Sequence, residues 1–408
     1  ESRSTSDEKR VTRSVVYVVK KKWVLLVILL LLSGCWDRKE LEKLAIVTGI
    51  GIDYGEEGDD YQVSFQIARS GEVKTPGSSS QDGGGGGGGS KSVWLLKSKG
   101  ATIFDAVRNA TLQSSRRLFL SHNQVVIINK EVAEKGLLPV IDFLIRDHEP
   151  RLNEWLLITR EQAETILSLE SGLEKISALA IADLMRNYYL SSKIRAVNLH
   201  EFAGTLLAKT TENTLPIIGV VKTDQEKGMV IEETGIFKSD KLIGYLNKKE
   251  TRGLLWVLGK TQDGVVVVEL PGEEGKVSLE IFGTKSKISS KVSEGKIRFE
   301  IDIAEVGSLG EQTSYANLSS REKLSLLENL KAKVIVEEVE AALKKAQECK
   351  ADIFGLGEYL QRQNRKEWEK VKDNWGELFP HLEVKVKVKT KIRWLGLLTK
   401  PTILEQIK

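Results

Sequence analysis

A short apolar run near the N-terminus most restricts how this chain can fold. Ten consecutive apolar residues, Trp23 to Leu32, follow three lysines at positions 20–22. A helix that crosses a bilayer needs about 20 apolar residues, so this run is too short to span a membrane. A basic segment before a short apolar stretch is typical of an export signal, which is removed before the mature protein functions. We therefore expect this part of the chain to contribute nothing to the globular core.

The four residues that end the run, Leu32-Ser33-Gly34-Cys35, resemble a bacterial lipobox. Small residues there let the segment enter a protease in extended form, the thiol receives a diacylglyceryl group, and cleavage precedes the cysteine. Two acyl chains, at about 0.8 kcal/mol per buried methylene, hold a protein durably on a membrane. The alternative is a signal anchor extended by Val15–Val19, which would bury the three lysines at about 2.5–3.5 kcal/mol each. We predict a lipoprotein signal peptide over residues 1–34 and lipidation of Cys35.

The predicted cleavage changes the meaning of the net charge. The sequence has 61 Lys and Arg against 57 Asp and Glu, a formal charge of +4. Seven of these basic residues and three of the acidic ones lie in residues 1–34, which leaves 54 of each in the mature chain. A neutral globular chain has no overall basic character for nucleic-acid binding. Two cysteines and four histidines offer no disulfide framework and few metal ligands. We predict no nucleic-acid partner, no metal and no cofactor.

Alternating strand and helix patterns behind the signal peptide predict a multi-domain α+β protein, with mixed and antiparallel sheets each packed with helices. Residues 35–160 are expected to form an N-terminal α/β domain with a flexible glycine-rich loop at 76–90. Residues 161–213 read as nearly all helical, which indicates a helical second domain or a connector. Residues 214–408 are expected to form a C-terminal α+β domain.

Individual elements follow from periodicity and capping signals. Asn198, with Glu201 three residues later, fits a capping box, and Asn247 is expected to begin a helix that runs to Leu258. A long helix over 321–349 has one apolar stripe expected to pack on a sheet, while its opposite side faces water. The stripe consists of Ala332, Ile335, Val339, Ala342 and Ala346. The strands expected in the C-terminal domain are 265–270, 277–284, 285–292, 296–306 and 383–394, mostly antiparallel.

No catalytic constellation is visible in the sequence. The glycines near residue 50 lack the spacing of a dinucleotide fingerprint, and phosphate-loop and G-x-S-x-G patterns are also missing. Ser121-His122 and Asp147-His148-Glu149 look like fragments of triads, but adjacent residues point in different directions, so we expect structural roles. Cys349, at the end of a long helix, is expected to be an inert small hydrophobe. We predict that the protein is not an enzyme.

The last predicted strand alternates apolar side chains with cations. Its cations are Lys385, Lys387, Lys389, Lys391 and Arg393. Because successive side chains of a strand point to opposite faces, all five are expected on one face. On a lipid-anchored protein this face would contact anionic headgroups or an acidic partner; the alternative is a solvated face that prevents edge-to-edge aggregation. Trp36, next to the modified cysteine, is expected at the bilayer surface.

Several segments carry a resemblance to a known family. The most specific is Gly34 to Leu41, which begins Gly-Cys-Trp-Asp-Arg and is followed by the apolar segment 45–53. The others are 117–122, 143–151, 352–357, Trp368, Trp375, Phe379-Pro380 and the terminal strand with Ile392-Arg393. From Cys35 to about Pro401 the chain resembles the Ger(x)C spore-germination lipoproteins, the C subunits of germinant receptors in endospore-forming bacteria.

This resemblance implies three domains, each with a β-sheet and helices, and a lipid anchor on the outer face of the inner spore membrane. It also implies assembly with a membrane-embedded A subunit and a transporter-like B subunit, which together respond to small nutrient germinants. The family has no catalytic residues, so only Cys35 carries over with a chemical role. We predict a non-enzymatic, lipid-anchored C subunit of a nutrient germinant receptor that is needed for spore germination.

Two other classes of protein remain open. A solute-binding lipoprotein of a transporter needs two similar α/β lobes around a cleft, whereas the second half of this chain looks antiparallel and does not repeat the first. A cell-wall hydrolase on a lipid anchor needs an acidic or metal-bound site in a cleft. Ligand binding would favour the former class, and activity on peptidoglycan the latter.

Overall fold

The structure is a computed structural model that describes residues 41–55, 60–69, 92–170, 174–208, 210–222, 227–314 and 317–394. The predicted signal peptide, Cys35, Trp36 and the predicted glycine-rich loop at 76–90 lie outside these residues. Contacts divide the chain into two units, residues 1–44 and 45–408. The described part of the first unit is the 3-10 helix η1 (Leu41–Lys43) and the first residue of strand β1. Residues from Ala45 onward form a compact unit that contains both β-sheets.

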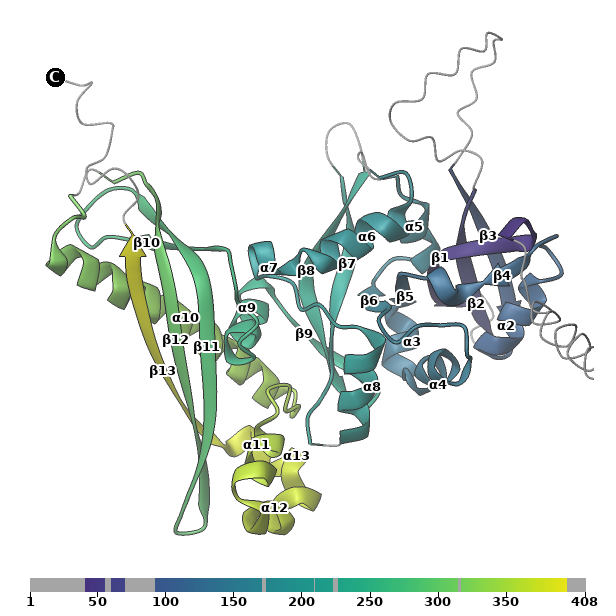
Figure 1. The fold of residues 1–408 in the computed structure, drawn as a ribbon. Coiled ribbons are helices and arrows are strands. Elements are labelled where there is room, and N and C mark those ends of the chain that lie inside the picture. The colour runs from purple at the N-terminus through teal and green to yellow at the C-terminus, as the bar shows by residue number, and fades with distance from the viewer. Residues whose placement is uncertain are drawn as a thin grey trace, which may run out of the picture. The chain divides into compact units, whose positions relative to one another are not determined.

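The first sheet has nine strands in the order β3-β2-β1-β5-β6-β7-β8-β9, with β4 paired to β1 (Figure 1). Their bounds are β1 (Leu44–Tyr54), β2 (Tyr61–Ala68), β3 (Val93–Gly100), β4 (Arg117–Phe119), β5 (Val125–Asn129), β6 (Trp155–Thr159), β7 (Thr214–Lys222), β8 (Lys227–Lys238) and β9 (Lys241–Leu246). Strands β1, β5, β6 and β7 pair in parallel, and antiparallel strands flank them on both sides. The predicted hairpins, β1–β2 and β8–β9, are confirmed.

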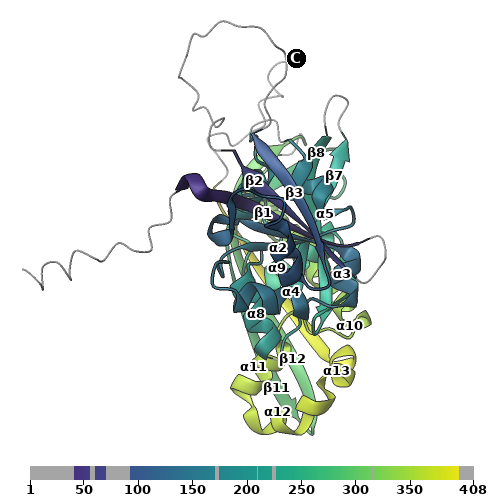
Figure 2. The same cartoon turned by 90° about the vertical axis from the view of Figure 1, so that its right-hand side faces the viewer.

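Helices cover both faces of this sheet because its central strands are apolar on both faces. Val126 and Ile128 of β5 lie in one hydrophobic core, whereas Val125 and Ile127 lie in another. The first core is closed by α2 (Ile103–Ala110), α3 (Lys130–Lys135), α4 (Leu138–Arg146) and α8 (Leu199–Ala208), and the second by α5 (Ala163–Ser168) and α6 (Ser177–Arg186). Figure 2 shows α2 and α4 on one side of β1–β3 and α5 on the other.

The first sheet continues across the predicted domain boundaries. Strand β7 begins at Thr214 and pairs with β6 through two residue pairs, Ile158 with Ile217 and Thr159 with Ile218. The helices expected at 161–213 pack on this same sheet, including the short α7 (Tyr188–Ser191), which has no fully buried residue but packs Tyr188 against the core. Strands β7, β8 and β9, which were expected in the C-terminal domain, thus extend the first sheet, and the division into domains stays a prediction.

The second sheet has the order β10-β11-β12-β13. Its strands are β10 (Val265–Glu269), β11 (Lys276–Ser293), β12 (Lys296–Gln312) and β13 (Glu383–Trp394). Strands β10, β11 and β12 are antiparallel, whereas β12 and β13 are parallel. The prediction of two strands over 277–292 was wrong, because β11 is continuous. A register shift between Ile281 and Gly283 moves the inward positions from odd to even numbers, and this change of phase looks like an interruption in the sequence.

Helix α10 (Arg321–Glu348) covers one face of the second sheet (Figure 1), as its apolar stripe predicts. The remaining elements of this region are α9 (Lys248–Val257), α11 (Leu356–Gln363), α12 (Arg365–Val371), η3 (Lys372–Asn374), α13 (Trp375–Leu378) and η4 (Phe379–His381). Asn247 begins α9, as predicted, and the structure adds a complete capping box with Glu250. Asn198 accepts from the Glu201 amide at 2.9 Å, but the Glu201 carboxylate turns to Arg195 and Lys260.

Helices α9 and α10 cross closely because α9 has a glycine at the contact. A Cβ atom on Gly253 would lie 2.0 Å from the Glu338 carbonyl oxygen of α10. At the same crossing, Arg252 and the Trp256 indole nitrogen, the latter at 2.8 Å, donate to the buried Glu338 carboxylate. Arg252 also donates to the Val265 carbonyl oxygen of β10 at 2.9 Å. One carboxylate therefore joins both helices to the edge of the sheet.

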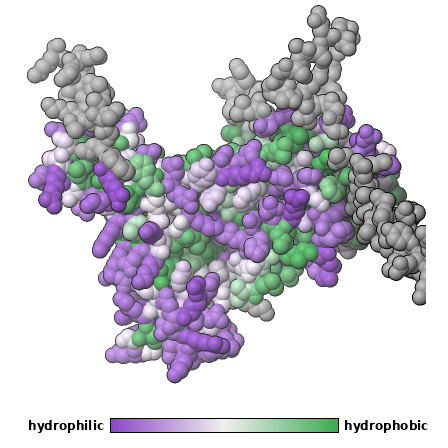
Figure 3. All heavy atoms as spheres, in the orientation of Figure 1, coloured by the Kyte–Doolittle hydropathy of each residue, from purple (hydrophilic) through white to green (hydrophobic). Residues whose placement is uncertain are grey.

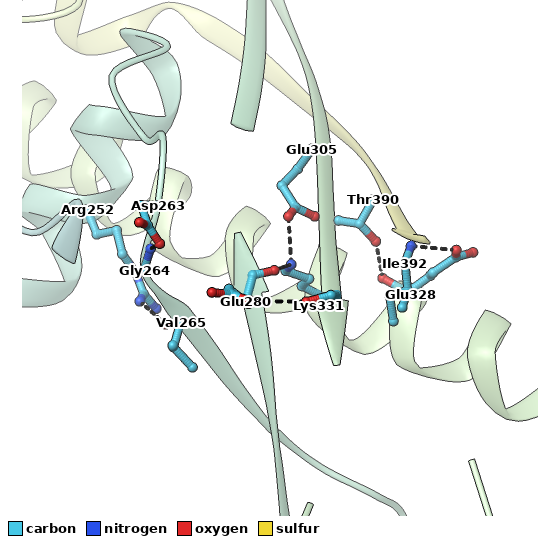
Figure 4. A network of polar contacts seen from close by, with 11 residues as sticks. Arg252, Asp263, Gly264, Val265, Glu280, Glu305, Glu328, Lys331, Thr390 and Ile392 are labelled. Carbon is cyan, nitrogen blue, oxygen red and sulfur yellow. Dashed lines mark hydrogen bonds and ion pairs between the residues drawn. The ribbon is translucent and has the colours of Figure 1, made fainter. Parts of the chain in front are cut away.

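A second buried charge ties α10 to the centre of the sheet (Figure 4). The Lys331 ammonium donates to Glu305 Oε1 of β12 at 2.6 Å and to the Glu280 carbonyl oxygen of β11 at 2.9 Å. Neither side chain is exposed, so burial raises the pKa of Glu305 and lowers the pKa of Lys331. Three residues before Lys331, the Glu328 carbonyl oxygen accepts from the Thr390 hydroxyl, and the Glu328 carboxylate accepts from the Ile392 amide of β13. These contacts set the position of the helix over three strands.

We predict that Lys331→Ala lowers the free energy of unfolding by about 3–5 kcal/mol, because it leaves the Glu305 carboxylate buried without its partner. The matched control is Lys333→Ala on the exposed side of α10, with an expected effect within about 0.5 kcal/mol. Urea unfolding measures the free energy of unfolding of both variants. The double variant Lys331→Met with Glu305→Leu should recover most of the loss. Equal stability of the two single variants would contradict this role.

Candidate functional site

The five predicted cations of the last strand lie on one face of β13. Lys385, Lys387, Lys389, Lys391 and Arg393 are all exposed, whereas Val384, Val386, Val388 and Ile392 pack against the core under α10. Among the described strands, β13 pairs only with β12, so it forms one edge of the second sheet there. The alternation expected from the sequence is therefore present. Contact of this face with a membrane or a partner stays a prediction.

The pairing of the strands adds four further cations to the same face: Lys285, Lys287, Lys291 and Arg298. In one row Lys285 lies opposite Ala304, which lies opposite Lys389; in the next, Lys287, Asp302 and Lys387 align. We call this surface, made of the outward residues of 283–291, 298–306 and 383–393, the basic face. It carries nine cations against three carboxylates, Glu300, Asp302 and Glu383.

The carboxylates compensate only one end of the basic face. Glu300 binds Lys291 at 2.6 Å and also Lys387, and Arg298 binds Glu383 at 2.7 Å. Six cations have no acidic side chain within 4.0 Å among the described residues: Lys285, Lys287, Lys385, Lys389, Lys391 and Arg393. Four lysines, Asp302 and Ala304 help to line a hollow of about 320 Å³, because Ala304 leaves space between longer neighbours. Positive charge is therefore concentrated toward the C-terminal end of β13.

A larger cavity of about 690 Å³ lies between α2 and α4. Its apolar lining includes Ile103, Phe104 and Phe143, and Phe104 is 46% exposed. Its charged residues are Arg108, Asp142, Arg146, Asp147 and His148, of which Arg146 binds Asp142 at 2.6 Å. Hydrophobic residues form separate patches among hydrophilic ones on the side drawn in Figure 3. No pattern in the sequence indicates this cavity, since its residues come from elements that are distant along the chain.

The two family-like segments at 117–122 and 143–151 meet beside this cavity. Glu149 accepts from Arg117 at 2.6 Å and from the Leu120 amide at 3.1 Å. Asp147 lies 3.6 Å from the His148 ring, but that ring is 82% exposed. The triad-like residues therefore hold loops together or face solvent, in agreement with the structural roles expected.

Buried carboxylates elsewhere also serve the fold. Asp352 accepts from the Leu356 and Gly357 amides at the start of α11 and from the Trp375 indole. Burial raises the pKa of Asp352 to about 6. Asp53 accepts from the Ala163 amide at 2.8 Å, and burial raises its pKa to about 6. Both carboxylates begin a helix.

The other chemical groups give no sign of a reactive centre. Cys349 is half-buried and burial raises the pKa of its thiol, which is opposite to the change that activates a nucleophile. Among the described residues, no group of three or more His, Cys, Asp or Glu side chains is arranged to hold a metal. The helices in that part of the chain are also too short or too polar to cross a membrane.

Glu154 is a buried carboxylate that titrates near neutrality. It accepts from Asn123 Nδ2 at 2.8 Å and from the Arg151 amide at 2.9 Å. Burial raises its pKa from 4.5 to about 7. Asn123 Oδ1 is buried without a partner among the described atoms. Turning over the Asn123 amide would therefore let Oδ1 accept a hydrogen bond from the hydroxyl of neutral Glu154.

We predict that Glu154 makes the protein less stable as pH rises. Its raised pKa contributes stability below pH 4.5 that is lost as pH passes about 7, a change of about 3 kcal/mol. Glu154→Gln should flatten this dependence, measured by urea unfolding between about pH 5 and about pH 8. The control is Glu340→Gln on the exposed side of α10, which should keep the wild-type slope. A wild-type slope in Glu154→Gln would refute the prediction.

Comparisons with known proteins cover nearly the whole chain. Residues 37–220 match the family model for the spore germination protein N-terminal domain, and residues 232–396 match the model "Spore germination B3/ GerAC like, C-terminal". The chain is 30% identical over 403 residues to spore germination protein KC of Bacillus subtilis, covering 92% of this chain and 97% of that protein. It is 28% identical over 380 residues to spore germination protein B3 of the same organism, covering 90% and 96%.

A solved structure shows the same fold. The crystal structure of the GerBC protein matches with a TM-score of 0.55 and 22% identity, covering 87% of this chain and 99% of that one. Together with the mixed sheets and helices described above, this match confirms the predicted α+β class. The resemblance to the Ger(x)C family is likewise confirmed, and the chain belongs to this family of spore germination proteins.

Proposed function

We propose that this protein is a non-enzymatic, lipid-anchored C subunit of a nutrient germinant receptor. It assembles with membrane-embedded A and B subunits on the outer face of the inner spore membrane and is needed for germination. The observation that carries the proposal is the match to spore germination proteins over both halves of the chain. The lipobox at Cys35 supports the anchor.

The chemistry of the described residues supports a role in assembly rather than catalysis. Asp352 and Glu149 each accept hydrogen bonds from two structural elements, and Glu338 of α10 accepts from Arg252 and Trp256 of α9. A general acid or base has to reach a substrate, and these carboxylates are occupied inside the fold. These carboxylates therefore stabilise the fold, which agrees with a protein that acts by binding partner proteins.

The lipid anchor is tested by Cys35→Ala expressed in sporulating cells. Since two acyl chains supply most of the membrane affinity, the variant should fall at least about tenfold in the washed inner-membrane fraction. Cys349→Ala removes the other cysteine and should stay at the wild-type level. An alkaline carbonate wash removes protein that is held only by charge. Retention of Cys35→Ala after this wash, with normal germination, would exclude the anchor.

Assembly is tested by affinity purification of the tagged protein from detergent-solubilised spore membranes. We expect an A and a B subunit to co-purify, because a C subunit acts within the receptor. Spores that lack the gene should fail to respond to at least one nutrient. Recovery of permease components would instead identify a solute-binding lipoprotein of a transporter. Recovery of neither, with normal germination on every nutrient, would reject both functions.

A further inference from the structure

We propose that the basic face docks flat on an anionic phospholipid surface, with the cations of β11 and β13 against lipid phosphates. This inference extends the proposed membrane location by naming the surface that meets the bilayer. It does not depend on the acyl chains, so it can be tested without them. The opposite face of the same sheet is occupied by α10 and the core.

Segregation of charge is the first argument. The chain after residue 34 has equal numbers of basic and acidic residues, yet the basic face carries nine cations against three carboxylates. Two of these carboxylates, Glu300 and Glu383, are already paired within the face. The six cations without acidic partners among the described residues retain long, exposed side chains. Such an excess attracts an anionic surface over about one Debye length.

The geometry of the cations is the second argument. The cations of β11 and β13 stand on strands that β12 separates, about 10 Å apart, at alternate residues about 7 Å apart along each strand. A bilayer presents many equivalent phosphates in a plane, so it can meet such a planar array without a matched sequence of side chains. The hollow over Ala304, between Lys285 and Lys389, leaves room for a phosphate group among four lysines.

Apolar groups at the border of the basic face are the third argument. Val265 and Val267 of β10 are 43% and 48% exposed, and Phe282, at the register shift of β11, is 47% exposed. Their buried neighbours Val266 and Val268 lie in the core, so the exposed residues point to the same side as the cations. Three acidic residues also lie on this side: Glu269 pairs with Lys276, Glu280 accepts from the Ser308 hydroxyl at 3.1 Å, and Glu311 lies opposite Ser278. Cations beside exposed apolar groups fit a membrane interface better than a purely acidic protein surface.

Vesicle binding tests the proposal on the fragment Ala45–Lys408, the compact unit that holds all three cores and lacks Cys35. The fragment is sedimented with vesicles of phosphatidylcholine alone, or of phosphatidylcholine and phosphatidylglycerol in equal parts. We expect binding only to the second kind, and loss of binding at high salt. Equal binding to both kinds, or to neither, would overturn the proposal.

Two double variants locate the binding surface. Lys389→Gln with Lys391→Gln should weaken binding about 25-fold, since each cation near an anionic surface contributes about fivefold. Lys285→Gln with Lys287→Gln should do the same from an inner strand, where edge aggregation cannot confuse the result. The matched control, Lys333→Gln with Lys344→Gln, removes equal charge from the exposed side of α10. Equal weakening by all three would show a general charge effect and reject the basic face.

The test also separates the alternatives. Binding of the fragment to polyglutamate but not to the anionic vesicles would identify an acidic polypeptide as the partner and overturn the lipid proposal. Failure of Cys35→Ala to leave the membrane would affect only the proposed anchor. Failure of vesicle binding would affect only the docking surface, because the fragment has no anchor.

Discussion

The Glu338 carboxylate of α10 is the contact on which the second sheet depends. It accepts from Arg252 and Trp256 of α9, and Arg252 continues to the Val265 carbonyl oxygen of β10. This arrangement needs the close helix crossing that Gly253 permits. Since α10 also holds β13 through Glu328, the same helix supports the edge strand that carries most of the basic face. Buried polar contacts therefore determine the shape of an exposed surface.

Periodicity predicted where α10 lies but not what fixes it there. Ile335, Val339 and Ala342 were visible as a stripe, and their burial follows. Lys331 and Glu338 stand four residues before and three after Ile335, so they occupy the same stripe. A pattern built on apolar residues treats charges in such positions as interruptions. The signal that identifies them is a charge on the buried side of an otherwise apolar stripe, because such a charge needs an opposite partner.

The pairing between strands that are distant along the chain could not be predicted from the sequence. The strand β13 and its alternation were predicted, but 70 residues separate it from β12, so no turn indicates its parallel register. The bulge near Gly283 changes the alternation within β11, so the sequence predicted two strands where the structure has one. The cations Lys285 and Lys287 were therefore not assigned to the face of Lys387 and Lys389. The alternation within one strand predicts which face of the sheet a residue lies on. The register between strands determines which residues lie beside it on that face.

The same distinction explains why net charge was a poor guide to partners. Equal totals of acidic and basic residues exclude a chain that is basic throughout, but they do not constrain how the charges are distributed over the surface. Here the acids Glu305 and Glu338 are buried in ion pairs where α10 packs on the sheet and on α9, whereas lysines accumulate on one open sheet face. A neutral protein can thus present a strongly cationic plane. Its interaction with anions is governed by that plane within about one Debye length, and not by the sum over the chain.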